Sequence, residues 1–277
     1  MHRFTATLIS QGQNKMLKRI SFPFIILLVL IASVVQVNAA QTEFYQLKIY
    51  HLKTEAQEKT VDAYLEKAYL PALHRCGIAK IGVFKPIVNE ITVLAEKLIY
   101  VFIPYKSFNS VLALEQKLAK DEQYATDGKD YLTALYNNAA YERLESVLLK
   151  AFDDAPHFVL PKLKSPMAQR VYELRSYESP SEQYFQNKVE MFNKGDEIGL
   201  FKRLNFNAVF YASVIAGSRM PNLMYLTTFE DRADREAHWK AFSADDYWKK
   251  LSTMPQYQHN VSKNDTKFIY PTDYSDI

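Results

Sequence analysis

Hydrophobic and polar residues alternate in two stretches that spell nearly the same strand. The stretches "FYQLKIY" (44–50) and "VYELRSY" (171–177) place tyrosines, a leucine and a basic residue at equal spacing. Alternation with a period of two, rich in Tyr, Ile and Leu, predicts a half-buried β-strand, and the first of the two is expected over 44–52. The chain is therefore expected to begin the same structural unit twice.

After the first of these strands, helical and extended patterns follow one another. Thr54 followed by Gln57 predicts a capped helix start, and apolar residues at helical spacing continue towards Gly77, which can end the helix. Ser107 can cap a second helix. The remaining predicted elements are strands at 78–88, 98–105 and 144–152 and a short helical stretch at 131–136. The predicted order is β-α-β-β-α-β.

The same order restarts at residue 170. A capping box at 179–182, with Pro180 at the first helical position, and Asp231 predict two helix starts. Strands are predicted at 170–177, 207–214, 223–229 and 265–271. Three prolines within 153–169 predict a linker. The chain thus divides into a first unit at 41–152, a linker at 153–169 and a second unit at 170–277.

These patterns predict an α+β fold made of two tandem ferredoxin-like βαββαβ units. Each unit forms a four-stranded antiparallel sheet with helices on one face, and its other face must be covered. Two such sheets packed face to face would close into an eight-stranded barrel. The alternative is a pair of independent units, each covered by a separate partner.

The first 40 residues have the pattern of a secretory signal peptide. A basic segment (15–19) precedes an apolar run (20–35), and a small-residue cleavage site follows, with cleavage after Ala39 or Ala40. The run is shorter than the roughly 20 apolar residues of a membrane-spanning helix. We therefore expect export to the periplasm or the extracellular space, with no stable membrane insertion after cleavage. Met16 is a second candidate start, besides Met1.

Removal of this leader changes the charge of the protein. The whole chain has 34 Lys and Arg against 31 Asp and Glu, but residues 1–40 hold four basic residues and no acidic one. The remaining chain has 30 basic and 31 acidic residues, a formal net charge of −1. A nucleic-acid partner normally requires a basic stripe, so none is expected. Cys76 is the single cysteine, so no internal disulfide can form.

Several stretches of the second unit resemble the NIPSNAP family. They are "VYELRSYES", "KVEMFNKGDEIGLFKRLNFNAVFYASVIAGS" and "MPNLMYLTTFEDRADREAHWKAF", and the match is best over about 170–275. The first unit is similar to a divergent copy, with "FYQLKIYHL" and "YLPALHRCGIAKIGVFKP". The resemblance implies a fold of the dimeric α+β barrel type. It implies no settled enzymatic activity, and a homo-oligomer is possible within this type of fold.

The resemblance also sets a limit on cellular role. Animal members of the family are associated with mitochondria and with vesicular or mitophagy-related roles. The leader of this chain is a continuous apolar run, whereas a mitochondrial transit peptide is Arg- and Ser-rich and amphipathic. We therefore expect an exported, bacterial type of member and do not transfer those roles.

The polar face of the second repeated strand carries the first candidate site. Glu173, Arg175 and Tyr177 alternate, so they share one side of the strand. We expect this side to face the opposing sheet or solvent. The functional interpretation is a ligand pocket inside the barrel, with Arg175 binding an anion and Glu173 accepting a hydrogen bond. The alternative is a Glu–Arg network that only pairs buried charges.

The stretch "AHWKAF" carries the second candidate site. His238 could act as an acid, a base or a haem ligand, and Trp239 could stack on a flat ligand. Helical neighbours diverge by about 100°, so the two cannot both face one pocket. The alternative is Trp239 in the helix–sheet core with His238 at its margin. His74 and Cys76 are two residues apart on a helix, which favours a structural thiol over a nucleophile pair.

Several motifs of defined chemistry do not occur in the sequence. It contains no G-x-S-x-G elbow, no phosphate-binding G-x-x-x-x-G-K-[ST] loop and no H-E-x-x-H zinc helix. The six histidines lack the spacing of a zinc site, so neither a metal nor a cofactor is expected.

The leading hypothesis is a protein that binds a small aromatic or anionic ligand within an α+β barrel. The alternatives are a monooxygenase- or isomerase-like enzyme of the same fold group and a protein-interaction module without a pocket. His238 is the best catalytic candidate. The expected ligand-binding residues are Tyr172, Glu173, Arg175, Tyr177, Tyr225 and Trp239.

Overall fold

The computed structural model describes residues 41–87 and 97–277, and the predicted signal peptide (1–40) lies outside these residues. Residues 41–277 make one compact unit. No helix of the described part of the chain is both long and apolar enough to cross a membrane.

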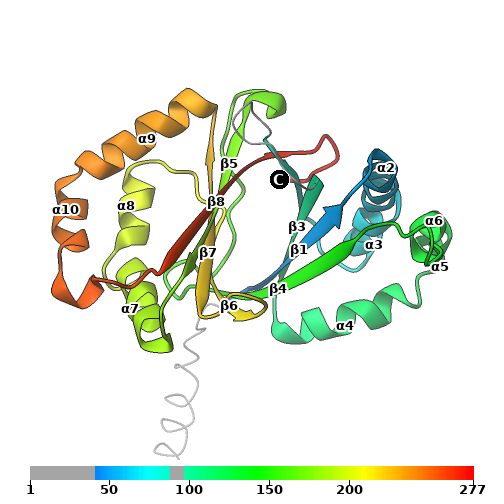
Figure 1. The fold of residues 1–277 in the computed structure, drawn as a ribbon, viewed down its shortest axis with the longest axis horizontal. Coiled ribbons are helices and arrows are strands. Elements are labelled where there is room, and N and C mark those ends of the chain that lie inside the picture. The colour runs from blue at the N-terminus through cyan, green and yellow to red at the C-terminus, as the bar shows by residue number, and fades with distance from the viewer. Residues whose placement is uncertain (1–40, 88–96) are drawn as a thin grey trace, which may run out of the picture. The chain divides into compact units, whose positions relative to one another are not determined.

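The strands of the described residues close into an antiparallel barrel, in the order β1-β3-β2-β8-β5-β7-β6-β4 (Figure 1). They are β1 (Phe44–Leu52), β2 (Gly82–Pro86), β3 (Lys97–Tyr105), β4 (Arg143–Ala151), β5 (Val171–Glu178), β6 (Phe210–Ala216), β7 (Asn222–Phe229) and β8 (Lys263–Pro271). Each half of the chain contributes four neighbouring strands. The barrel is completed where β2 pairs with β8 and where β4 pairs with β6, so both seams join the two halves.

The helices of the two halves lie on opposite sides of this barrel (Figure 1). The first half has α2 (Glu55–Tyr64), the π-helical segment η1 (Leu65–Tyr69), α3 (Leu70–Arg75), α4 (Phe108–Leu118), α5 (Glu122–Asp127) and α6 (Lys129–Leu132). The second half has α7 (Glu182–Phe192), α8 (Glu197–Arg203), α9 (Arg232–Ala244) and α10 (Asp246–Ser252), with short 3₁₀ turns at Met167–Gln169 and Pro255–Tyr257.

Three predicted helix starts are confirmed by their hydrogen bonds. The Thr54 side chain accepts from the Gln57 amide, and the Gln57 side chain accepts from the Thr54 amide, which is a complete capping box. Ser107 and Asp231 cap α4 and α9 in the same way, each accepting from the amide three residues later. These caps position the helices against the sheet.

Other local predictions were wrong. Helix α7 begins at Glu182 with Ser181 as its N-cap and no side-chain capping bond, so the box at 179–182 does not form and Pro180 precedes the helix. The predicted strand at 78–88 is described as a strand only over Gly82–Pro86, because Ile78 is still bonded to the end of α3, and residue 88 lies outside the described residues. The helical stretch predicted at 131–136 is present only as the end of the short helix α6, which ends at Leu132.

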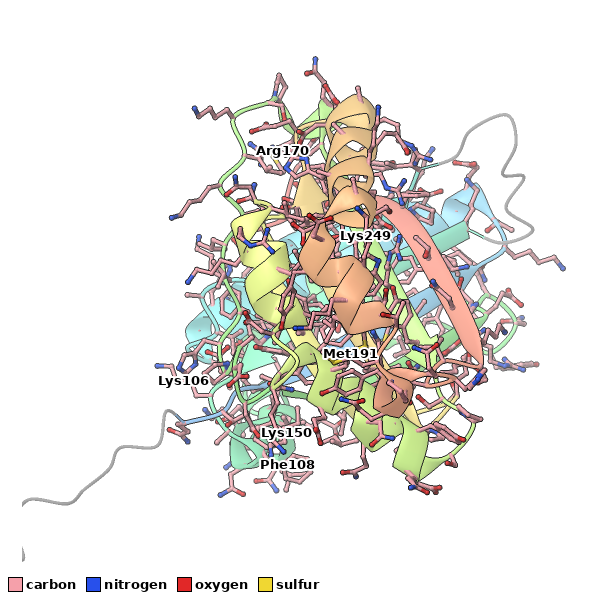
Figure 2. The ribbon with its side chains drawn as sticks, turned by 90° about the vertical axis from the view of Figure 1, so that its left-hand side faces the viewer. Lys106, Phe108, Lys150, Arg170, Met191 and Lys249 are labelled. Carbon is pink, nitrogen blue, oxygen red and sulfur yellow. The ribbon has the colours of Figure 1, made fainter. Side chains whose placement is uncertain are left out.

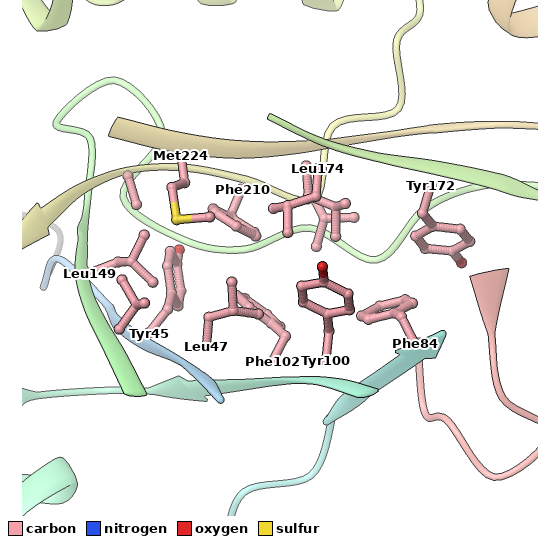
Figure 3. Close-up of a cluster of buried hydrophobic side chains, with 14 of the residues drawn as sticks. Tyr45, Leu47, Phe84, Tyr100, Phe102, Leu149, Tyr172, Leu174, Phe210 and Met224 are labelled. Atoms are coloured by element: carbon pink, nitrogen blue, oxygen red, sulfur yellow. The ribbon is translucent and has the colours of Figure 1, made fainter. Parts of the chain in front are cut away.

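The prediction that the two sheets cover each other is confirmed. Side chains from the two sheets point towards one another and fill the barrel (Figure 3). Rings from different halves are in contact, with Phe102 stacked on Phe210 at 4.9 Å between centroids and Phe84 against Tyr172 at 5.1 Å. Burial of such large rings is the main stabilising contribution to the barrel interior.

The segment 153–169 is docked against both halves. Phe158 packs against the barrel interior, and its amide donates to the carboxylate of Glu43 at 2.8 Å. Further along, the Glu230 carboxylate accepts from the amides of Lys164 and Ser165. These bonds fix the connection between the halves in one conformation.

Candidate functional site

The polar row of β5 faces the helices rather than the inside of the barrel. Glu173 is completely buried and accepts from Arg235 and Trp239 of α9, each at 2.8 Å. It also accepts from Arg175 at 2.6 Å. The expectation that this row faces the opposing sheet or solvent was therefore wrong. The row with Tyr172 and Leu174 faces inward instead, and α9 brings the second arginine that allows Glu173 to be buried.

The charges of this layer are paired among themselves. Burial raises the pKa of Glu173, but the hydrogen bond from Arg235, the charge of Arg175 and the bond from Trp239 outweigh burial and hold the pKa below its usual value. Arg175 lies 3.9 Å from the centre of the Trp239 ring and donates to Tyr177 at 2.9 Å. An incoming anion would have to displace the Glu173 carboxylate, which makes this layer a poor anion site.

Tyr225 belongs to the same layer. Its hydroxyl lies 2.8 Å from that of Tyr177, and both rings are buried. A second buried ion pair, between Lys188 and Glu197 at 2.9 Å, completes the helix-facing side of the sheet. Figure 2 looks onto the helices that cover this layer, with Met191 of α7 and Lys249 of α10 labelled.

The structure separates two of the predicted site residues from this group. Tyr172 points into the barrel and packs on Phe84 (Figure 3). His238 donates through Nδ1 to the Asp234 carbonyl at 2.8 Å and packs on Phe206, away from Glu173. The structure therefore brings together Glu173, Arg175, Tyr177, Tyr225 and Trp239, but neither Tyr172 nor His238.

A cavity of about 200 Å³ opens at one end of the barrel. Its inner wall is apolar and is formed by Ile49, Leu98, Tyr100, Val147, Leu174 and Met224. Its outer wall is polar and is formed by His51, Glu145, Ser176, Ser218, Arg219, Asn222, Asp265 and Lys267. Both halves of the chain contribute to each wall, so the cavity exists only because the barrel is closed.

Hydrogen bonds and ion pairs order the polar wall. Asp265 pairs with Lys267 at 2.9 Å and with Arg219 at 3.2 Å. Burial raises the pKa of Asp265, but the hydrogen bonds and charges of these two cations outweigh burial and lower it. His51 Nε2 lies 2.8 Å from Glu145 Oε1. The wall therefore presents fixed, alternating charges in front of an apolar chamber.

Two uncharged residues of the polar wall are bonded to each other. The Ser176 hydroxyl and the Asn222 side chain are bonded at 2.9 Å, and both residues are buried. Burial raises the pKa of Tyr100, so its hydroxyl stays protonated at neutral pH and can donate a hydrogen bond. Sequence reasoning missed this cavity. Its signal was Ser176, the polar residue on the otherwise apolar row of the repeated strand.

The described residues contain no group of three or more His, Cys, Asp or Glu side chains placed to hold a metal ion. His74 bonds to Asp276 at 2.8 Å, on the C-terminal segment that crosses back to the first half. This contact assigns His74 a structural role.

Comparisons with known proteins agree with this architecture. The family model described as NIPSNAP matches residues 172–276. A protein from Lactobacillus acidophilus NCFM, described as a "putative monooxygenase", has a crystal structure that aligns with this chain at a TM-score of 0.52 and 8% identity. The alignment covers 83% of this chain and 94% of that protein. A protein of the same description from Fusobacterium nucleatum aligns at a TM-score of 0.54 and 9% identity, over 84% of this chain and 93% of that protein.

A NIPSNAP family protein from Agrobacterium tumefaciens covers 39% of this chain and 97% of its own, at 16% identity and a TM-score of 0.34. No curated protein matches the chain. At 8–9% identity, the first two similarities establish the fold alone. The chain therefore folds as an α+β barrel of the dimeric type, and residues 172–276 are a NIPSNAP family domain.

Proposed function

We propose that the protein binds a small ligand with one aromatic ring in the cavity at the end of the barrel. The observation that supports this proposal is the cavity itself, an apolar chamber behind a polar wall. Its volume of about 200 Å³ suits a ligand of this size, since an apolar cavity of about 150 Å³ can hold benzene. Pockets for drug-sized ligands measure roughly 300–1,000 Å³, so such a ligand would not fit.

The charges of the polar wall favour an aromatic ligand over a strongly anionic one. The cations Arg219 and Lys267 are balanced by Glu145 and Asp265, and Arg219 also approaches Glu178 at 3.7 Å. A free carboxylate would compete with two existing ones for these cations. A neutral ring with one polar substituent could bury the ring beside Leu174 and Met224 and bond to Tyr100 or Ser176.

The test uses protein purified after expression of the full chain. Saturation-transfer NMR is recorded with p-cresol, benzoate and benzylamine as matched neutral, anionic and cationic probes. We expect the strongest signal for p-cresol. An Ile49→Trp variant places a large side chain in the apolar chamber and should reduce that signal at least tenfold.

The control is Ile215→Trp, the same substitution at an exposed position of β6 outside the cavity. It should bind p-cresol as the wild type does. Equal binding by Ile49→Trp and the wild type, or no binding of any probe, would overturn the proposal. Circular dichroism establishes that both variants fold.

The site of action is a separate part of the proposal. The signal-like pattern of residues 1–40 supports a protein that acts after export. Mass spectrometry of protein recovered from the periplasm or the medium should find an N-terminus at Ala40 or Gln41. An intact N-terminus at Met1 or Met16 would contradict export by cleavage.

A further inference from the structure

The helix-facing layer of the first half contains an amine in unusual surroundings. Lys48 lies on β1, at the position equivalent to Arg175 in the repeated strand. Its Nζ is 3.4 Å from the Tyr69 hydroxyl, 4.7 Å from the centre of the Tyr69 ring and 6.0 Å from that of Tyr50. No carboxylate oxygen of the described residues lies within 4.0 Å of Lys48 Nζ. This half-buried cation is therefore surrounded by rings and hydroxyls.

The elements packed around Lys48 supply little negative charge. Its strand neighbours are Val101 on β3 and Ser146 on β4. Tyrosines of α2, η1, α5 and α6 form the cluster over this part of β1. Tyr64 is stacked on Tyr131 at 3.7 Å between ring centroids, and its hydroxyl lies 2.8 Å from that of Tyr124. Glu115 on α4 is the carboxylate that acts on Lys48 from a distance.

This environment disfavours the charged form of Lys48. Burial lowers the pKa of Lys48 to about 8, and the charge of Glu115 offsets only part of the effect. Burial also raises the pKa of Tyr50 and Tyr69 well above the usual value, so these phenols stay neutral near pH 8. A neutral phenol can bond to the amine but cannot stabilise its positive charge as a carboxylate would.

The backbone beside Lys48 is also unusual. Tyr69 ends the π-helical segment Leu65–Tyr69, which is inserted between α2 and α3. Such segments are rare and often occur at functional sites. Here the last residue of the segment, Tyr69, carries the hydroxyl that contacts Lys48 Nζ.

From these contacts we propose that Lys48 is a reactive amine site for small aldehydes. The lone pair of neutral Nζ attacks the carbonyl carbon, a C–N bond forms, and the carbonyl oxygen takes a proton to give a carbinolamine. Loss of water then gives an imine, with no net oxidation or reduction. Lys48 lies on the helix side of β1, whereas the cavity of the proposed function lies on the barrel side, so the two sites are independent.

The test is reductive alkylation of the folded protein with limiting acetaldehyde and cyanoborohydride, read by peptide mass spectrometry. The aldehyde forms the imine, and hydride from cyanoborohydride reduces it to a stable secondary amine. The internal control is Lys150, an exposed lysine on β4 of the same sheet. At pH 8 about half of an amine with a pKa of 8 is neutral, against roughly 0.4% for one of pKa 10.4.

We expect Lys48 to be alkylated at least ten times faster than Lys150 at pH 8. Its rate should level off above about pH 8, whereas the rate of an ordinary amine keeps rising with pH up to about pH 10. The variant Lys48→Arg should lose this adduct and keep the one at Lys150. Alkylation of Lys48 at or below the rate of Lys150, including complete protection by burial, would overturn the proposal. So would an alkylation rate of Lys48 that keeps rising steeply with pH above about pH 8.

Discussion

The two helix-facing layers of the barrel are built on the same strand pattern and differ in how their charges are paired. In the second half, Glu173 accepts from Arg175 and Arg235 and is buried. In the first half, Gln46 stands at the position of Glu173 and Lys48 at that of Arg175. Tyr105 donates to Gln46 at 2.9 Å, so the acid of one layer is replaced by a neutral hydrogen-bond acceptor in the other.

The helices that cover the two layers also carry different residues at equivalent positions. Counted from the capping residues Ser107 and Asp231, the eighth position is Glu115 in α4 and Trp239 in α9. Trp239 covers Arg175 and bonds to Glu173, whereas Glu115 is exposed. A repeated backbone therefore does not imply a repeated site. One layer is a closed ion-pair network, and the other leaves an amine without a paired carboxylate.

The largest effect on the free energy of unfolding is expected when the buried carboxylate of Glu173 is removed. Glu173→Gln leaves Arg175 and Arg235 buried without their anion, so we expect a loss of about 3–5 kcal/mol in the free energy of unfolding. Urea denaturation measures it. The matched control is Glu190→Gln, which breaks an exposed pair with Lys194 and should cost less than about 0.5 kcal/mol. Equal effects would show that the buried network stabilises the protein no more than an exposed ion pair does.

The second prediction concerns the amine. Lys48→Met should stabilise the protein at pH 7, by about 1–3 kcal/mol, because it removes a cation that burial disfavours. The folded-state pKa of Lys48, about 8, is below its usual value of 10.5. Between these values the unfolded chain binds the proton and the folded protein does not, so wild-type stability rises with pH.

The advantage of Lys48→Met should therefore be constant below about pH 8 and shrink towards pH 10.5. Urea denaturation of both proteins at several pH values measures this difference, in which the titration of other groups cancels. A destabilising effect at pH 7 would show that the ammonium is well accommodated by the tyrosines.

The third prediction concerns a substitution that makes the layer of the first half resemble that of the second half. Gln46→Glu places a carboxylate two residues before Lys48, as Glu173 stands before Arg175. It should raise the pKa of Lys48, and at pH 8 it should slow alkylation of Lys48 at least tenfold relative to Lys150. Gln46→Met is the control without charge and should leave the reactivity high. An unchanged rate in Gln46→Glu would mean that the strand residue does not reach the amine.

The smallest expected effect concerns a feature that the layers share. Ser107→Ala and Asp231→Ala each remove a capping bond, at 3.3 Å and 2.8 Å respectively. Each should lower the free energy of unfolding by about 1 kcal/mol, measured by urea denaturation. Similar losses would show that α4 and α9 are held alike, so that only the charges distinguish the layers. A loss several times larger at one cap would contradict this.

The architecture could be predicted from the sequence because local patterns carry it. The first repeated strand was placed at Phe44–Leu52, where the structure has β1. The direction of its two faces could not be predicted from β1 and β5 alone, because each strand has two mixed rows. The deciding partner of Glu173 is Arg235, which belongs to a helix more than 60 positions away.

The candidate site was harder to predict for a similar reason. Glu173, Arg175 and Tyr177 do lie on one side of β5, and the alternative interpretation as a charge-pairing network describes their contacts better than a ligand pocket does. Trp239, which the sequence placed in a separate candidate site, bonds to Glu173 as well. The cavity gathers residues from six strands and one turn of both halves. No local pattern connects residues so far apart, and only the closure of the barrel brings them together.

The joining of both sheets in one polypeptide has a further consequence. A barrel assembled from two identical chains must carry every substitution twice, so its two outer layers remain copies of each other. Here the seams between β2 and β8 and between β4 and β6 unite segments that can vary separately. The second half can then keep the ion-pair network that stabilises the protein. The first half can acquire a reactive amine that would destabilise the protein too strongly if both halves carried it.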